Sequence, residues 1–493
     1  MRKKLFTIIM SLALMVTMMP AMTLTANADG EDPYLSQPLC FTAEEDGITV
    51  ALTKGDGAPD ASFKYSQNNS DWYNYVPETP ITINNGDSVY FKAQNENSSL
   101  GNDSGRWQFS TAENTGNEEG IVVSGNILSL LYSDFANKSS SQLPEFVFRE
   151  LFSETTIKDV SHLKLPSTTL AKWCYYYMFS NCNYLKNAPE LTANNLAEYC
   201  YGNMFSGCNK LEIAPALPAT KLAVECYSEM FKGCEKLVNA PVLPATSLAD
   251  YCYRSMFDEC LSLTDAPKLP ATKLATNCYQ SMFYHCESLI NPPILPATEL
   301  AVGCYVGMFS DCKKLERTPE LPAKALKNAC YGYMFYDCSS LNEVSVRFGS
   351  EYVTTEFLDT WLEGVAATGT FYGPASLENS GVVPDGWDFI EIKEEPKIKL
   401  KGVVAIVAAI TAVAVVAKAV CANKCATSSY GCCKMPFASV CANPFVQYYA
   451  NPFMKYCAKT GSFGSGRTAF KANFPWQLFS FTNGKSFVFP WMM

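Results

Sequence analysis

Hydrophobic positions in the middle of this chain return every 26 residues. Tyr follows the first cysteine of each unit, Met-Phe stands four and five residues after it, a second cysteine stands eight residues after it, and Leu comes three residues later still. The unit reads C-Y-x-x-M-F-x-x-C-x-x-L-x-x-A-P-x-L-P-A-T-x-L-A-x-x. A fixed period of this length predicts structural repeats that pack on their neighbours. The seven first cysteines are Cys174, Cys200, Cys226, Cys252, Cys278, Cys304 and Cys330.

Within one unit, an apolar stripe runs from Leu222 to Cys234 at offsets of 0, 1, 4, 5, 8, 9 and 12 residues. We interpret this spacing as one face of an α-helix. Thr220 could cap the amino end of that helix, and Leu211–Leu217 is short and extended in character. Each unit is therefore predicted to hold a strand, a tight turn and a helix, stacked so that identical side chains form ladders.

The segment C-x-x-L-x-x-A-P-x-L-P that follows M-F-x-x-C resembles the BspA-like leucine-rich repeats of bacterial surface proteins. The resemblance covers roughly residues 140–395, including a degenerate first unit around Phe148–Phe152. It implies a surface protein that binds host, matrix or glycan ligands. This sequence departs from the usual consensus by placing Ala-Pro where Ile or Val is common.

These patterns predict an α/β solenoid of the leucine-rich-repeat type, with short parallel strands plus helices, preceded by a small all-β, sandwich-like domain. The boundary after the solenoid is marked by charge, because residues 397–493 hold eleven Lys or Arg and no Asp or Glu. The predicted divisions are a signal peptide (1–28), the sandwich-like domain (29–135), the solenoid (136–344), a cap (345–393), a linker with a candidate transmembrane segment (394–423) and a cationic, aromatic and Cys-rich tail (424–493).

Residues 29–135 alternate apolar and polar positions in short runs bounded by Gly, Asn, Asp or Ser, which favours a β-sandwich. Trp72, Tyr73 and Tyr75 lie among these runs. They could form a platform for stacking sugars, but such aromatic side chains more often fill a core. The predicted strands contain Ile48–Leu52, Phe63–Tyr65, Ile81–Ile83, Val89–Phe91 and Trp107–Phe109.

The repeat cysteines invite a disulfide interpretation, which the predicted geometry disfavours. Eight residues of helix span about 12 Å, and a disulfide needs Cα atoms within about 7 Å of each other. A spacing of eight also lacks the short chelate that zinc sites use. We therefore expect the cysteines to be small buried side chains in ladders, with no metal and no cofactor.

Export is predicted from the amino terminus, where three cationic residues, Arg2–Lys4, precede an apolar run and Ala26-Asn27-Ala28. At the other end, the uncharged run 402–417 extends to Cys421 around Lys418 and is a candidate membrane anchor over residues 402–421. The expected location is the cell surface or the extracellular space. The formal net charge of −10 combines about −21 upstream with +11 in the tail, so no basic stripe suits a nucleic-acid partner.

No catalytic constellation is readable in the sequence, so we expect no enzyme. The chain has two histidines, His162 and His285, and His285 stands where other units carry Asn, Gly, Glu or Asp. No phosphate-binding loop and no Gly-x-Ser-x-Gly motif occur. Two carboxylates placed for glycoside hydrolysis are a matter of three-dimensional distance, which the sequence leaves open.

The candidate function is recognition through positions that vary beside the fixed ones. The partner expected is a host or matrix protein, or a surface glycan. Two alternatives stay open, a structural spacer without a ligand and an accessory module of a polysaccharide-degrading system. The candidate binding residues are Glu190, Lys268, Glu320, Asn239, Asp265, Asn291 and Arg317, in the company of Ala216, Val242 and Ile294.

Overall fold

The computed structural model describes residues 32–112, 120–138, 142–393, 480–482 and 486–488. Residues up to Glu394 form one compact unit, and Glu395–Met493 form another. Within the second unit, β13 (Ser480–Thr482) and β14 (Ser486–Val488) pair as an antiparallel hairpin. The predicted signal peptide, the candidate transmembrane segment and the rest of the tail lie outside the described residues.

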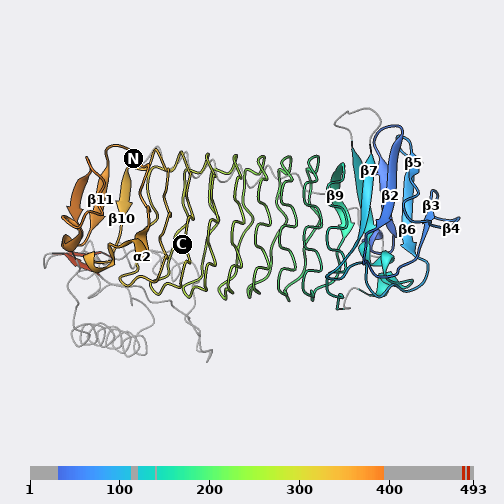
Figure 1. Ribbon diagram of the computed structural model, residues 1–493, viewed down its shortest axis with the longest axis horizontal. Helices are drawn as coiled ribbons and strands as arrows, with labels where there is room; N and C mark the ends of the chain where they lie inside the picture. The colour runs from blue at the N-terminus through green and yellow to red at the C-terminus, as the bar shows by residue number, and fades with distance from the viewer. Residues whose placement is uncertain (1–31, 113–119, 139–141, 394–479, 483–485, 489–493) are drawn as a thin grey trace, which may run out of the picture. The chain divides into compact units, whose positions relative to one another are not determined.

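The amino-terminal region holds two sheets, of six and three strands (Figure 1). Their orders are β4-β3-β6-β1-β8-β9 and β5-β2-β7. All five runs expected to be strands are strands, and the sequence interpretation missed β1, β4 and β8. The bounds are β1 Leu39–Ala43, β2 Ile48–Lys54, β3 Phe63–Ser66, β4 Tyr73–Asn74, β5 Ile81–Ile83, β6 Ser88–Ala93, β7 Trp107–Ala112, β8 Ile121–Asn126 and β9 Ile157–Lys164, with 3-10 turns η1 Pro33–Leu35, η2 Ile127–Leu130 and η3 Phe135–Asn137.

Aromatic rings from both sheets fill the space between them. The Phe109 ring of β7 lies 4.7 Å from that of Phe41 and 5.1 Å from that of Phe91, measured between centroids. All three are fully buried. The alternating runs of the sequence point their apolar members inward here, as the period of two along a strand requires.

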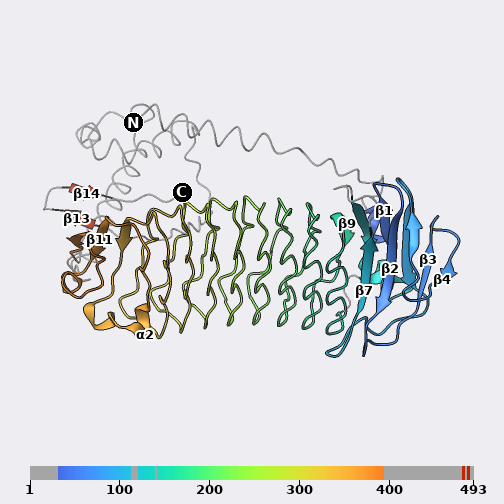
Figure 2. The same cartoon turned by 45° about the horizontal axis from the view of Figure 1, so that its top comes forward.

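The 26-residue units form a row of coils, one coil per unit (Figures 1 and 2). The prediction of a helix in each unit is wrong, because residues 222–234 form a chain of tight turns and no unit contains an α-helix. We call the segment from Glu225 to Cys234, and its equivalents, the turn ribbon. Each coil is therefore built differently from the expected strand–turn–helix unit.

Backbone hydrogen bonds in the turn ribbon alternate between two directions. The Tyr227 N–H donates to the carbonyl of Cys252 in the next coil at 3.1 Å, and the Cys226 N–H donates to Ala223 three residues back at 3.4 Å. The same alternation continues residue by residue to Cys234. Every N–H and C=O from Glu225 to Cys234 has a partner, so the ribbon satisfies its buried backbone as completely as a helix would.

Every fourth residue of the ribbon adopts left-handed backbone angles. In one coil these residues are Glu225 (φ 50°), Glu229 (φ 56°) and Gly233 (φ 71°). Left-handed residues reverse the chain locally, so the apolar pairs Cys226-Tyr227 and Met230-Phe231 both face the core. The apolar stripe thus has a period of four, whereas a helix would rotate a period-four stripe by about 40° per turn.

On another segment of the coil, neighbouring units pair as single parallel bridges. Ile213 bridges Asn187 on one side and Asn239 on the other, and Asp265 bridges Asn239 and Asn291. These bridges are shorter than the strands that the sequence predicted. The proline of each Ala-Pro pair has no N–H to donate, which limits the ladder to isolated bridges.

The core of the stack consists of ladders of identical side chains. Tyr201, Tyr227 and Tyr253 stack face to face with centroids 5.9–6.0 Å apart and rings within 10° of parallel. A phenylalanine ladder runs beside them from Phe152 to Phe335 at similar spacing. Ring stacking along one axis explains why these positions do not vary between units.

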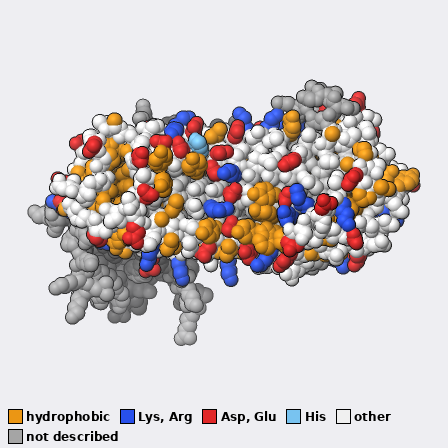
Figure 3. Space-filling model, in the orientation of Figure 1, with side chains coloured by type: hydrophobic (Ala, Val, Ile, Leu, Met, Phe, Trp, Pro, Cys, Tyr) orange, Lys and Arg blue, Asp and Glu red, His pale blue; other side chains and the backbone are white. Residues whose placement is uncertain are grey.

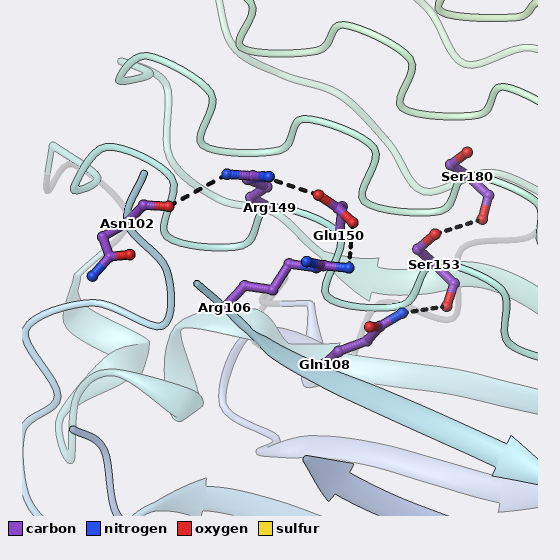
Figure 4. Close-up of polar contacts among 7 residues, drawn as sticks. All are labelled: Asn102, Arg106, Gln108, Arg149, Glu150, Ser153 and Ser180. Carbon is purple, nitrogen blue, oxygen red and sulfur yellow. Dashed lines mark hydrogen bonds and ion pairs between the residues drawn. The ribbon is translucent and has the colours of Figure 1, made fainter. Parts of the chain in front are cut away.

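The amino-terminal sheets continue directly into the stack. Strand β9 of the first coil pairs in parallel with β8, and Phe109 stacks on Phe152 at 5.5 Å, so the phenylalanine ladder begins inside the sandwich. Figure 4 shows the polar contacts across this junction, in which Glu150 accepts from Arg106 at 2.5 Å and from Arg149 at 2.9 Å.

The far end of the stack is closed by residues 343–391. Trp361 lies against Tyr331 and Phe335, the last members of the two ladders, with centroids 6.4 and 6.3 Å away. Beside it lies a parallel sheet in the order β10-β11-β12. The elements are β10 Glu343–Ser345, η4 Ser350–Tyr352, α2 Thr355–Leu358, β11 Thr370–Gly373, η5 Ala375–Leu377 and β12 Asp388–Glu391.

Candidate functional site

The residues chosen from the sequence as binding candidates lie in two exposed columns, which we call the strand face. The first column contains the equivalents of Asn239 and the second the equivalents of Val242, three residues further on. Around Val242 the chain alternates, with Pro241 and Leu243 buried and Val242 78% exposed. This alternation projects the variable residue of each A-P-x-L-P segment outward.

Neighbouring coils bring some of the candidates together. The Asn291 Nδ2 donates to Asp265 Oδ1 at 2.7 Å, and Asp265 also accepts from the Thr264 hydroxyl at 2.7 Å. Lys268 stands between Val242 and Ile294 in adjacent coils. Asn239, Asp265, Asn291 and Arg317 occupy four successive coils of the first column.

Other candidates are separated by the length of the stack. Glu190 and Glu320 are five coils apart in the second column, so they do not share a compact site. Glu320 is paired with Arg347 at 2.9 Å, a contact that lies near the closed end. The candidates therefore form an extended surface rather than one pocket.

Apolar side chains are unusually exposed on the strand face. Ile294 is 81% exposed, Val242 78% and Ile213 67%. A hollow of about 440 Å³ lies beside Val242 and is lined by Ala216, Pro241 and Pro244 among other residues. Figure 3 shows apolar side chains gathered in clusters between charged ones on the face in view. Clustered exposed apolar groups are typical of interaction surfaces.

The repeat cysteines are buried and unpaired, as free thiols. The thiol of each second cysteine donates to a carbonyl of the preceding coil, for example Cys234 to Phe205 at 3.3 Å and Cys338 to Phe309 at 2.9 Å. Burial raises the pKa of Cys200 to about 12 and that of Cys182 to about 11. Thiols held in the neutral form are poor nucleophiles and poor metal ligands. In the part of the chain that the structure describes, no cluster of His, Cys, Asp or Glu suits a metal ion.

The one adjacent Cys–His pair is not arranged for catalysis. Cys286 is buried and its thiol donates to the Phe257 carbonyl at 3.0 Å, while the His285 ring packs edge-on against Tyr284. His285 also has left-handed backbone angles (φ 58°). The variation at this position is therefore limited to residues that tolerate such a backbone, among them Gly, Asn and Asp.

The aromatic trio of the sandwich divides between core and surface. Tyr75 is buried, and its hydroxyl donates to Thr79 and accepts from the Leu52 N–H. The Lys92 ammonium lies 3.7 Å over the ring of Trp72, and Tyr73 is 59% exposed. The three rings therefore do not form one open platform, and the core interpretation holds for Tyr75.

A second hollow, of about 500 Å³, was missed by the sequence interpretation. It lies on the outer side of the turn ribbon near the closed end of the stack, and its lining includes Tyr284, Gly307, Tyr333, Tyr336 and Glu363. The sequence held two signals for this hollow. Gly307 is the only glycine at its position in the seven repeats, and tyrosine stands at the equivalent positions 284 and 336.

Comparison of the chain with family models, with curated proteins and with solved structures gave no match. Among the described residues, none of the helices has the length and apolar character that a membrane crossing needs.

Proposed function

We propose that this chain is an exported cell-surface protein that acts as a binding or adhesion scaffold. The observation that carries the proposal is the strand face, where Val242 and Ile294 expose about four fifths of their side chains in one column. An extended surface of variable residues on a rigid stack suits the recognition of a large ligand.

The arrangement of the coils supports a solenoid of the leucine-rich-repeat type as the class of this fold. Each coil bonds mainly to the coils before and after it, and the ends are covered by the sandwich and by Trp361. The turn ribbon would then be an unusual replacement for the helix of that class. The resemblance of the C-x-x-L-x-x-A-P-x-L-P segment to BspA-like repeats supports the same assignment.

The chemistry of the strand face favours a host or matrix protein as its ligand. Apolar side chains flanked by Lys268 and Asp265 resemble the mixed surface of a protein interface, where apolar groups lie in the centre and charged groups at the rim. The amino-terminal cationic and apolar pattern supports export, and residues 402–421 would supply the membrane anchor.

Binding of the purified full chain to arrays of matrix proteins tests this proposal. Val242→Lys and Ile294→Lys place charge at the centre of the strand face, and we expect each to reduce binding at least tenfold. Val302→Lys is the matched control, because Val302 is 48% exposed and lies next to the turn ribbon, away from the strand face. Absence of any protein ligand, or equal binding by all three variants, would overturn the proposal and favour a structural spacer.

A further inference from the structure

The hollow on the turn ribbon, which we call the slot, is lined by residues of four successive coils, from Ser281 to Glu363. Its floor comes from the coil of Gly307 and Ser310, which have small side chains at positions where the adjacent coils carry Ser281 and Tyr284 on one side and Tyr333 and Tyr336 on the other. The two walls are two coils apart, which corresponds to about 10 Å at the usual strand spacing.

The slot is wide enough for a single ring. A ring that contacts two walls at carbon–carbon distances of about 3.5–4.0 Å needs a separation of about 7–8 Å, and walls about 10 Å apart leave room for it. Gly307 has no side chain to fill the floor of the slot. The space above it is open, because a Cβ at this position would lie within 4 Å of only one atom, the Ser281 hydroxyl oxygen at 3.3 Å. The equivalent positions of the other coils carry Tyr, Asn, Glu or Ser and would fill it.

The walls present aromatic rings together with hydroxyl groups. The rings of Tyr333 and Tyr336 lie 6.2 Å apart on the same wall, and Tyr284 stands on the opposite one. A hydrogen bond with Asp359 raises the pKa of Tyr333 and helps to position its ring. Ser281 and Val306 also line the hollow, as do Thr360 and the carboxylate of Glu363 from the coil beyond Tyr333.

The electrostatic surroundings of the slot are acidic. Burial, followed by the carboxylates of Asp311 and Asp258, raises the pKa of Tyr284. Glu363 lines the slot itself, and Lys313, the cation beside Asp311, is already paired with it at 2.7 Å. A sulfated or carboxylated ligand would therefore be repelled.

We infer that this slot is a carbohydrate subsite that holds one neutral pyranose ring between Tyr284 and the Tyr333–Tyr336 wall. Pyranoses have apolar C–H faces that pack on aromatic rings and equatorial hydroxyls that need donors and acceptors, and the slot offers both. The site lies outside the strand face, so the inference is independent of the protein ligand proposed for that surface.

Calorimetric titration of the full chain with neutral hexasaccharides of glucose, mannose, galactose and N-acetylglucosamine, and with heparin, tests the inference. We expect at least one neutral hexasaccharide to bind and heparin to bind more weakly. Tyr284→Ala, Tyr336→Ala and Gly307→Asn should each lower that affinity at least tenfold. Gly307→Asn is compatible with the fold because Asn203 stands at the equivalent left-handed position.

Tyr177→Ala is the matched control, since Tyr177 occupies the same column as Tyr333 at the other end of the stack. Its affinity should be unchanged, as should that of Val242→Lys, and unchanged melting temperatures show that the variants fold. Equal affinity in all slot variants, tighter binding of heparin, or no binding of any neutral hexasaccharide would overturn the inference. These results do not affect the proposal of protein binding by the strand face, because binding to the matrix-protein arrays tests that proposal.

Discussion

Single residues in the core show where this fold tolerates a buried polar group. The hydroxyls of Tyr175 and Tyr227 are buried and have no hydrogen-bond partner. The Tyr75 hydroxyl, in contrast, has two partners, at 2.8 and 2.9 Å. Tyr175 and Tyr227 are therefore held by ring stacking, whereas Tyr75 is also held by its hydroxyl.

This contrast predicts opposite results for one substitution at two sites. Tyr227→Phe removes a hydroxyl without a partner, and we expect it to leave stability unchanged or to raise it by up to about 1 kcal/mol. Tyr75→Phe leaves the Leu52 N–H without an acceptor and should cost about 1–3 kcal/mol. Urea unfolding of both variants measures the difference. A loss at Tyr227 as large as that at Tyr75 would contradict the assignment.

The buried thiols predict that the protein is sensitive to alkali. Burial raises the pKa of Cys200 and Cys338 to about 12, against an ordinary value near 9. Between these values the unfolded chain loses protons that the folded chain retains, so stability falls as pH rises. We expect the melting temperature to be flat up to about pH 8 and to fall steeply from pH 9 to 11. A flat profile through pH 11 would show that the thiols are not buried.

The turn ribbon is the element whose backbone most constrains the sequence. One left-handed residue in every four must tolerate positive φ, which costs a residue with a Cβ about 1–2 kcal/mol relative to glycine. Ala329 is an exposed ribbon residue with left-handed backbone angles (φ 53°). Ala325 is also exposed, but it lies in a parallel β-bridge and its φ is not positive.

A pair of glycine substitutions separates these two backbones. Ala329→Gly should stabilise the protein by about 1 kcal/mol, because it relieves the left-handed residue. Ala325→Gly should destabilise it by about 0.5–1 kcal/mol, because glycine loses more conformational freedom on folding. Differential scanning calorimetry of the two variants gives the sign directly. The same sign in both would contradict the alternating backbone of the ribbon.

The sequence predicted the strands of the sandwich well and the ribbon poorly. The strand runs around Val50 and Ile83 alternate with a period of two, which few other structures produce. The ribbon stripe from Leu222 to Cys234 fits a period of 3.6 over one unit, and only its strict period of four distinguishes it from a helix. The signal that could have decided was the placement of Gly, Asn, Ser or Asp at about half of the positions that recur every fourth residue of the ribbon.

The candidate sites divide in the same way. Exposure of Val242 and Ile294 could be predicted, because Pro and Leu on either side alternate inward along one extended segment. The slot was not predicted, although Gly307, Tyr284 and Tyr336 carry signals for it. The helix expected in each unit does not have the outer face that the turn ribbon presents.

At the scale of the whole molecule, the register of the stack depends on whole units. The Tyr227 N–H reaches the Cys252 carbonyl 25 residues ahead, and side chains stack at 26. Removing residues 229–254 joins Ser228 to Ser255 and preserves both relations. Removing residues 229–253 leaves one extra residue inside the ribbon and displaces the left-handed positions.

We expect the 26-residue deletion to fold with a cooperative transition and a melting temperature within a few degrees of the intact chain, since stability in a stack is nearly a sum over neighbours. The 25-residue deletion should melt much lower or lose cooperativity. Circular dichroism melts of the two proteins make the comparison. Equal melting temperatures would show that the ribbon tolerates a change of register.

The alternation of backbone bonds in the turn ribbon also determines how the stack would respond to mechanical load. Half of the ribbon's N–H groups point along the row of coils, so tension applied between its two ends loads a few of these bonds at a time and peels coils off singly. Each coil released would lengthen the tether by roughly 80–90 Å, the contour of 26 extended residues less one coil spacing. Force spectroscopy would record this as a regular series of peaks, so the protein would extend in steps instead of rupturing once.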